Sequence, residues 1–180
     1  MDLQFFGGRG SSSSAGAGGM AKIRSFERSA YKQDTESSMI VTANGEVIQR
    51  SGDEKYVFGS RADVEKMNGG IASHNHPNNS TFSDTDVVNG IAKGNLKEMR
   101  IVTKSGEVHS IKNKGATVDQ RRAFSAQYRN QMMKATNNIH TKQRRGEKVD
   151  SEKYLKQHME SWMEKNAKSY NLSFSKGKVK

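Results

Sequence analysis

The chain has no cysteine, which excludes disulfides, thiolate metal sites and cysteine nucleophiles together. Proline and tryptophan each occur once among its 180 residues. No uninterrupted apolar run reaches the ~18 residues that a membrane-spanning helix needs, and the N-terminus lacks the apolar segment of a signal peptide. We therefore expect a cytoplasmic protein in a reducing compartment, with no membrane partner.

Apolar side chains are also scarce. Residues of the AVILMFWYC set make up 32% of the chain, and with glycine added the fraction stays below the ~45–50% typical of globular proteins. Residues 1–20 consist largely of Gly, Ser and Ala, which bury too little surface to offset their ordering entropy. We expect this segment to be disordered and the remainder to form one small domain with tails.

Basic side chains exceed acidic ones, but only in one part of the chain. The net charge of +11 divides into +2 over residues 1–116 and +9 over residues 117–180. A basic segment is typical of a surface that binds nucleic acid, and a solvated helix face has the same composition. The excess of positive charge is therefore evidence about what residues 117–180 bind, and it does not concern residues 1–116.

The hydrophobic pattern up to residue 116 predicts alternating strands and helices. Asn44-Gly45 lies between strand-like residues 37–41 and 47–49, which predicts a hairpin with a tight type I′ turn. The other elements expected here are a strand at 56–58, a helix at 60–67, a strand at 71–73, a helix at 83–93 that Ser83 caps, and a hairpin of 99–103 with 108–111.

Residues 117–180 have a helical pattern, with apolar stripes in two helices that break near residues 144–146. A basic tail is expected at residues 174–180. The predicted fold class is α/β: a small mixed β-sheet flanked by helices over residues 21–116. Residues 117–180 are expected to form an appended, basic C-terminal helical segment.

Two histidines follow the strand expected at residues 71–73. Residues two apart in an extended segment point to the same side, so His74 and His76 present both imidazoles together. A turn after Pro77 and a helix from Ser83 would bring the carboxylate of Asp86 back to them. Two histidines and one carboxylate with an open fourth position suit catalytic Zn²⁺, which lowers the pKa of its bound water to ~7.

Peptide hydrolysis on such a metal also needs a group that takes a proton from the water and returns it to the leaving amine. A glutamate is the usual side chain for this role. Two upstream residues are candidates: Glu36, at the entry to the first expected hairpin strand, and Glu46, just after its Asn-Gly turn.

The order His74-x-His76-Pro77 followed by Ser83-x-x-Asp86 resembles the JAMM motif of the JAB/MPN metalloproteases. Its particular residues are similar to those of the bacterial and phage branch of this family. The resemblance covers residues 35–112. Six residues separate His76 from Ser83, one fewer than in the commonest form of the motif. The resemblance implies a JAB/MPN, cytidine-deaminase-like fold and a zinc-dependent peptidase or isopeptidase.

The family also implies a role for each residue of the motif. His74, His76 and Asp86 would bind the metal, and Ser83 would position or stabilise the oxyanion. In the family the glutamate begins a strand of the central sheet, which favours Glu36 as general base and acid, with Glu46 as the fallback. The implied substrate is a protein or peptide, such as a ubiquitin-like protein or a phage structural protein.

Two alternatives to catalysis follow from the ends of the chain. The first residues, Met-Asp-Leu-Gln-Phe-Phe-Gly-Gly, resemble the start of prophage-encoded proteins near head-assembly genes, which indicates a phage assembly or partner-binding protein on a JAB scaffold. The basic residues 117–180 favour nucleic-acid association, as in the RadC-type relatives of the fold. The expected location is the cytoplasm of the bacterial host, and an assembly protein would also be expected on the virion.

Overall fold

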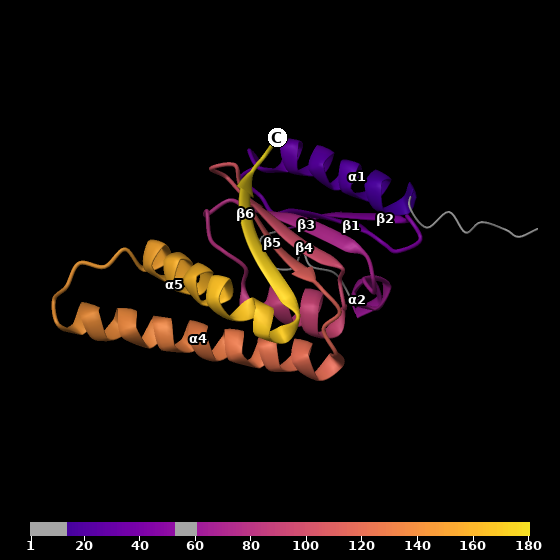
Figure 1. Cartoon of the computed structure of the whole chain (residues 1–180). Helices are drawn as coiled ribbons and strands as arrows, with labels where there is room; N and C mark the ends of the chain where they lie inside the picture. The colour runs from indigo at the N-terminus through magenta and orange to yellow at the C-terminus, as the bar shows by residue number, and fades with distance from the viewer. Residues whose placement is uncertain (1–13, 53–60) are drawn as a thin grey trace, which may run out of the picture.

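The computed structural model describes residues 14–52 and 61–180, and its centre is a mixed six-stranded sheet in the order β2-β1-β3-β4-β5-β6 (Figure 1). Strands β3 and β4 are parallel, and all other neighbouring pairs are antiparallel. The α/β class is thus confirmed. The strands are β1 (Ser37–Val41), β2 (Val47–Ser51), β3 (Ile71–His76), β4 (Glu98–Thr103), β5 (Glu107–Asn113) and β6 (Leu172–Lys178).

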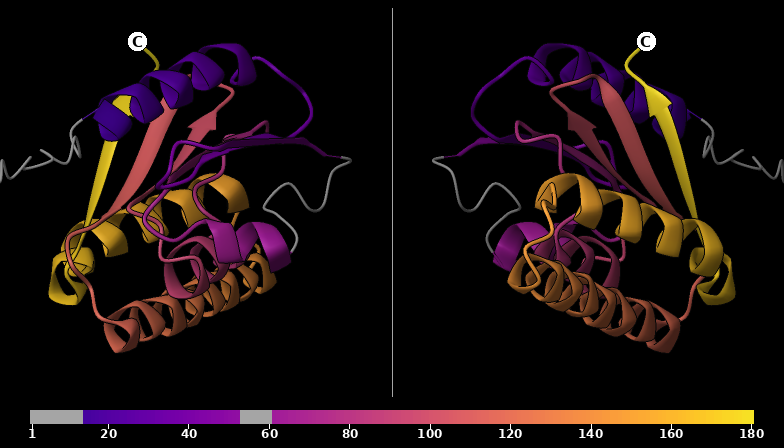
Figure 2. Two further views of the ribbon diagram at one scale, coloured as in Figure 1. Left: turned by 90° about the vertical axis from the view of Figure 1, so that its right-hand side faces the viewer. Right: turned by 90° about the vertical axis from the view of Figure 1, so that its left-hand side faces the viewer.

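The helices cover both faces of this sheet. They are α1 (Ser14–Ala30), α2 (Arg61–Lys66), α3 (Asp84–Asp86), the π-helix η1 (Val87–Lys93), α4 (Val118–Arg144), α5 (Ser151–Asn166) and the 3₁₀ turn η2 (Ala167–Tyr170). Helix α1 lies across one face, and the others lie on the opposite side (Figure 2). No helix in the described part of the chain is long and apolar enough to cross a membrane.

Successive side chains of a strand point to opposite faces of the sheet, and this alternation decides which residues face α1 and which face the other helices. Val41 of β1 and Ile71 of β3 pack on Ile23 of α1 in a small cluster. Ile40 and Ala72, one position away, belong to the larger core on the opposite face. Histidines at 74 and 76 share the parity of Ala72, so β3 directs both imidazoles into the layer that contains α3, α4 and α5.

The hairpin of β1 and β2 is confirmed, but its predicted type I′ turn is wrong. The Thr42 amide donates to the Glu46 carbonyl at 2.9 Å, so three residues form the loop. Only Gly45 in this loop has a positive φ, at 89°. A three-residue hairpin needs one left-handed position instead of two. Asn44 contributes through its side chain, whose Oδ1 accepts from the Glu46 amide at 3.3 Å.

Helix α1 begins inside the segment that the composition predicts to be disordered. That prediction is wrong for residues 14–20, which form the first turns of the helix. Ile23, Phe26 and Ala30 provide an apolar stripe that is buried on the sheet. Gly19 is small enough to approach the side chain of Val41. Residues 1–13, the strand predicted at 56–58 and the helix start at Ser60 lie outside the described residues.

Residues 117–180 share a core with the sheet. The predicted helices appear as α4 and α5, and Phe124, Tyr128, Met159 and Met163 pack in the same cluster as Ile101 of β4. The segment predicted as an appended extension therefore completes the hydrophobic core.

The prediction of a tail at 174–180 is wrong, because residues 174–178 belong to β6 and pair with β5. Leu172 and Phe174 point towards the core, and the lysines after them are exposed at the sheet edge.

The helix predicted at 83–93 is confirmed as α3 continued by η1. Its second part has π geometry, and the Gly94 amide donates to the Asn89 carbonyl, five residues earlier, at 2.7 Å. Gly90 packs directly against β4, since a Cβ atom there would lie 2.5 Å from Met99 Sδ. A larger residue at position 90 would therefore displace the side chain of Met99.

Tyr128→Phe is expected to lower the free energy of unfolding by ~1–3 kcal/mol, because the Tyr128 hydroxyl donates to the Phe82 carbonyl at 2.5 Å in the core. Without the hydroxyl, the buried carbonyl of Phe82 loses this hydrogen-bond donor. Urea unfolding measures the change at constant m-value. Tyr170→Phe is the matched control at a partly buried position. Equal stability losses in the two variants would contradict this role of the hydroxyl.

Candidate metal centre

Strand β3 places both histidines near the middle of the sheet. The strand is longer than the predicted 71–73, because β4 pairs with it up to His76 and Thr103. His74 is 2% exposed and His76 is 5% exposed. The prediction that both imidazoles lie on one side is confirmed, since their Nε2 atoms are 2.8 Å apart.

The loop after His76 reverses the chain towards the sheet. The Asn79 amide donates to the His76 carbonyl at 3.2 Å, and Asn79 has a φ of 59°, a left-handed conformation that asparagine tolerates. Its Oδ1 accepts from the Ser105 amide at 2.7 Å, which ties the loop to the turn between β4 and β5. This reversal allows α3 to begin beside the histidines.

A capping box at the start of α3 orients the carboxylate of Asp86. The Ser83 Oγ accepts from the Asp86 amide at 3.0 Å, and the Ser83 amide donates to Asp86 Oδ2 at 2.7 Å. The sequence predicts this cap. Ser83 thus contacts Asp86 through both its backbone and its side chain, and it holds that carboxylate beside the imidazoles.

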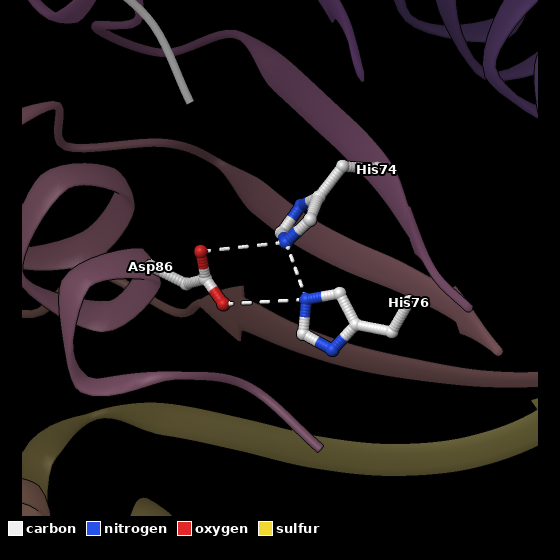
Figure 3. Close-up of side chains that lie close together, drawn as sticks. All are labelled: His74, His76 and Asp86. Atoms are coloured by element: carbon white, nitrogen blue, oxygen red, sulfur yellow. Dashed lines mark hydrogen bonds and ion pairs between the residues drawn. The ribbon is translucent and has the colours of Figure 1, made fainter. Parts of the chain in front are cut away.

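The three predicted ligands meet in one buried cluster (Figure 3). Asp86 Oδ1 lies 3.3 Å from His74 Nε2, and Oδ2 lies 3.6 Å from His76 Nε2. Two ligand atoms held ~2.0–2.1 Å from a tetrahedral ion are ~3.3 Å apart, and the three separations in the cluster, 2.8, 3.3 and 3.6 Å, lie around this value. Two imidazoles and one carboxylate can therefore hold a metal ion here.

The electrostatics of the cluster favour the protonation state of a metal-binding carboxylate. Burial alone would raise the pKa of Asp86, but the two imidazoles outweigh it and hold this pKa well below its usual value. Burial lowers the pKa of His76, while Asp86 and, more weakly, the charge of Glu36 raise it above its usual value overall. Asp86 is therefore ionised at neutral pH.

Ser80 contacts the far side of the His76 ring, and sequence reasoning did not identify it. Its Oγ lies 2.8 Å from His76 Nδ1. A proton on Nδ1 that is donated to this oxygen leaves the lone pair on Nε2, which is the form that a metal ligand requires. The only signal in the sequence is a hydroxyl four residues after the second histidine.

Ser80→Ala is expected to weaken metal binding by about tenfold, because it removes the contact that orients His76 and selects its tautomer. A competition titration against a chromogenic zinc chelator measures the dissociation constant. Ser105→Ala removes an exposed hydroxyl from the neighbouring turn and is the matched control. Unchanged affinity in Ser80→Ala would show that the hydroxyl does not orient the ligand.

The two candidate glutamates lie at opposite ends of β1. Ser38 is opposite His74 in the β1–β3 register. Glu36, two residues before Ser38, lies close enough to His76 for its charge to raise the pKa of that imidazole. Glu46 follows the hairpin turn near the Val41–Ile71 pair, where its carboxylate accepts from Lys66 Nζ at 2.9 Å. Of the two, Glu36 is thus the glutamate at the histidine end, and it is partly buried.

His109 is buried near the cluster but is not among its ligands. Its Nδ1 lies 3.3 Å from Thr81 Oγ1, and its Nε2 lies 3.4 Å from Glu160 Oε1 of α5. Burial lowers the pKa of His109 to about 4, with Lys156 adding to the effect, so the ring is neutral. His109 is thus a neutral, buried residue of the layer beside the cluster.

Comparison of the chain with known family models, curated proteins and solved structures found no match.

Proposed function

We propose that this protein is a zinc-dependent peptidase or isopeptidase of the JAB/JAMM type. The observation that carries the proposal is the buried cluster of His74, His76 and Asp86, with Glu36 at the adjoining strand end. The spacing of these residues in the sequence resembles the JAMM motif, and the fold brings the three ligands within 4.8 Å of one another.

In this proposal His74 and His76 would hold zinc through Nε2, and Asp86 would hold it through its carboxylate. The bound ion would supply a Lewis acid and would lower the pKa of a coordinated water to ~7. Ser83 keeps the Asp86 carboxylate in place through the capping box, and Ser80 keeps the His76 ring in the tautomer that binds metal. The side chains of all three proposed ligands are buried, so few water molecules compete with the metal for their ligand atoms.

Glu36 moves the proton in this mechanism. Its carboxylate accepts a proton from the attacking water and returns it to the nitrogen of the leaving amine, so that the peptide or isopeptide bond breaks. The Ser83 hydroxyl accepts a hydrogen bond from the Asp86 amide and keeps its own proton for donation. We assign that proton to the developing oxyanion of the substrate carbonyl.

The proposed substrate is a protein or peptide, either a ubiquitin-like protein or a phage structural protein. A phage assembly protein that uses the same scaffold without catalysis is the alternative. Hydrolysis by the zinc-loaded protein separates the two proposals, because a binding scaffold holds zinc without cleaving any bond.

Glu36→Gln is expected to lower hydrolysis by ~10²–10⁴-fold while zinc content stays unchanged, because the amide cannot accept the water proton. Casein and linked ubiquitin dimers are incubated with the zinc-loaded protein, and mass spectrometry detects new termini. Glu46→Gln, at the far end of β1, is the matched control and should retain activity. Full activity in Glu36→Gln, or hydrolysis that persists after chelation, would contradict the mechanism.

A further inference from the structure

A groove of about 530 Å³ lies between η1 and the N-terminal half of α4, which pack side by side. It contains none of the three ligands of the candidate metal centre. Its lining combines small apolar side chains with long basic ones: Val88, Ala92, Lys93, Val118, Arg121, Arg122, Ser125, Ala126 and Arg129. The groove therefore presents both an apolar surface and a concentrated positive charge.

Most of the positive charge in the groove is not neutralised. Arg129 pairs with Asp84 at 3.1 Å. Within the described part of the chain, Lys93, Arg121 and Arg122 form no ion pair with a carboxylate. Three cations without a counter-ion, beside a fourth that has one, favour an anionic ligand.

Arg121 is the strongest single indication of a ligand. The residue is 8% exposed, and its Nη1 donates to the Ala116 carbonyl at 2.8 Å. Its Nε is buried and has no hydrogen-bond partner among the described residues. A buried guanidinium donor without a partner is costly, and a carboxylate that binds in the groove reduces that cost.

The apolar residues of the groove indicate what kind of anion fits. Val118 is 48% exposed, although it begins a long helix whose other large apolar side chains are mostly covered. Val88 and Ala92, one turn apart on η1, lie on the opposite wall. Within residues 14–52 and 61–180 no aromatic ring lines the groove, so this part of the chain supplies no stacking platform of the kind on which nucleic-acid bases are usually held.

We propose that this groove binds an acidic segment of a partner protein in which carboxylates alternate with small apolar side chains. The carboxylates pair with the guanidinium groups, which match them in a two-pronged geometry, and the apolar side chains cover Val118 and the η1 wall. The groove thus recruits a protein, and this role goes beyond the proposed hydrolysis because it does not require the metal.

Fluorescence anisotropy with a short fluorescein-labelled peptide in which Glu and Asp alternate with Val and Ala tests the proposal on the full chain, with and without EDTA. Removing two groove charges with Lys93→Ala plus Arg122→Ala is expected to weaken binding at least about tenfold. Val118→Ser is expected to weaken it about threefold through lost apolar contact. Lys134→Ala plus Arg144→Ala removes two charges elsewhere on α4 and should change the affinity less than about twofold.

Three results would overturn the proposal. The first is the absence of saturable binding of the acidic peptide by the folded full chain. The second is an equal loss of affinity in the control pair on the distant part of α4, which would indicate a diffuse effect of net charge. The third is tighter binding of a DNA duplex of equal charge with no effect of Val118→Ser, which would make the surface a site for polyanions. Binding that persists in EDTA supports the groove even if hydrolysis is absent.

Discussion

Asp86→Asn is expected to reduce the zinc content of the purified protein from about one ion per chain to less than about one tenth of an ion. Among the described residues the carboxylate is the only anionic ligand in the cluster, and its charge would offset that of the cation. Asparagine keeps the shape of the side chain and an oxygen that can accept from the Ser83 amide, so α3 retains its cap. Mass spectrometry with inductively coupled plasma measures the metal after dialysis.

Asp84→Asn is the matched control for this experiment. Asp84 lies two residues away on the same helix, is partly exposed and pairs with Arg129 instead of the histidines. Its variant should keep its zinc, whereas His74→Ala plus His76→Ala should lose it in the same way as Asp86→Asn. Equal zinc content in Asp84→Asn and Asp86→Asn would show that the cluster is not the metal site.

Glu27→Ala is expected to lower the free energy of unfolding by ~3–5 kcal/mol, a large part of the ~5–15 kcal/mol typical of a domain. Glu27 lies on α1 and accepts from Arg100 of β4 at 2.7 and 3.0 Å. Ser73 of β3 also donates to it at 2.9 Å. Alanine at position 27 leaves a largely buried guanidinium without its two-pronged partner, and Glu98 alone replaces only part of that interaction.

Urea unfolding of a double variant separates the loss of the ion pair from the loss of packing. Glu27→Leu plus Arg100→Met removes both charges and keeps apolar volume between α1 and the sheet, so it should be clearly more stable than Glu27→Ala. A double variant that is as unstable as the single one would mean that packing, and not an unpaired charge, accounts for the effect.

The parts of the candidate site that depend on residues close together in the sequence could be predicted. The two-residue spacing of His74 and His76 on a strand and the three-residue spacing of Ser83 and Asp86 in a capping box are local patterns, and both appear in the structure. The choice between Glu36 and Glu46 could not be made from local spacing. It depends on the register that places Ser38 opposite His74, which is a contact between two separate strands.

The role of residues 117–180 was the largest difference between expectation and structure. The periodicity of α4 and α5 indicates apolar stripes but does not show which surface they cover. In the structure Tyr128 donates to Phe82, next to the loop that carries Ser80 and Ser83, and Leu172 begins the last strand of the sheet. A variant that lacks residues 117–180 would also lack part of the core. A loss of partner binding in that variant would therefore not identify a separate partner-binding segment.

The amino-acid order alone indicates the α/β class, most helices and strands, and the two histidines and aspartate of the candidate metal centre, because side-chain periodicity and helix capping act over a few residues. The fold adds the contacts between distant segments: the pairing of β6 with β5, the position of Glu36 at the histidine end and the groove between η1 and α4. These features depend on which apolar faces bury one another, and that selection is made by the packing of the whole chain.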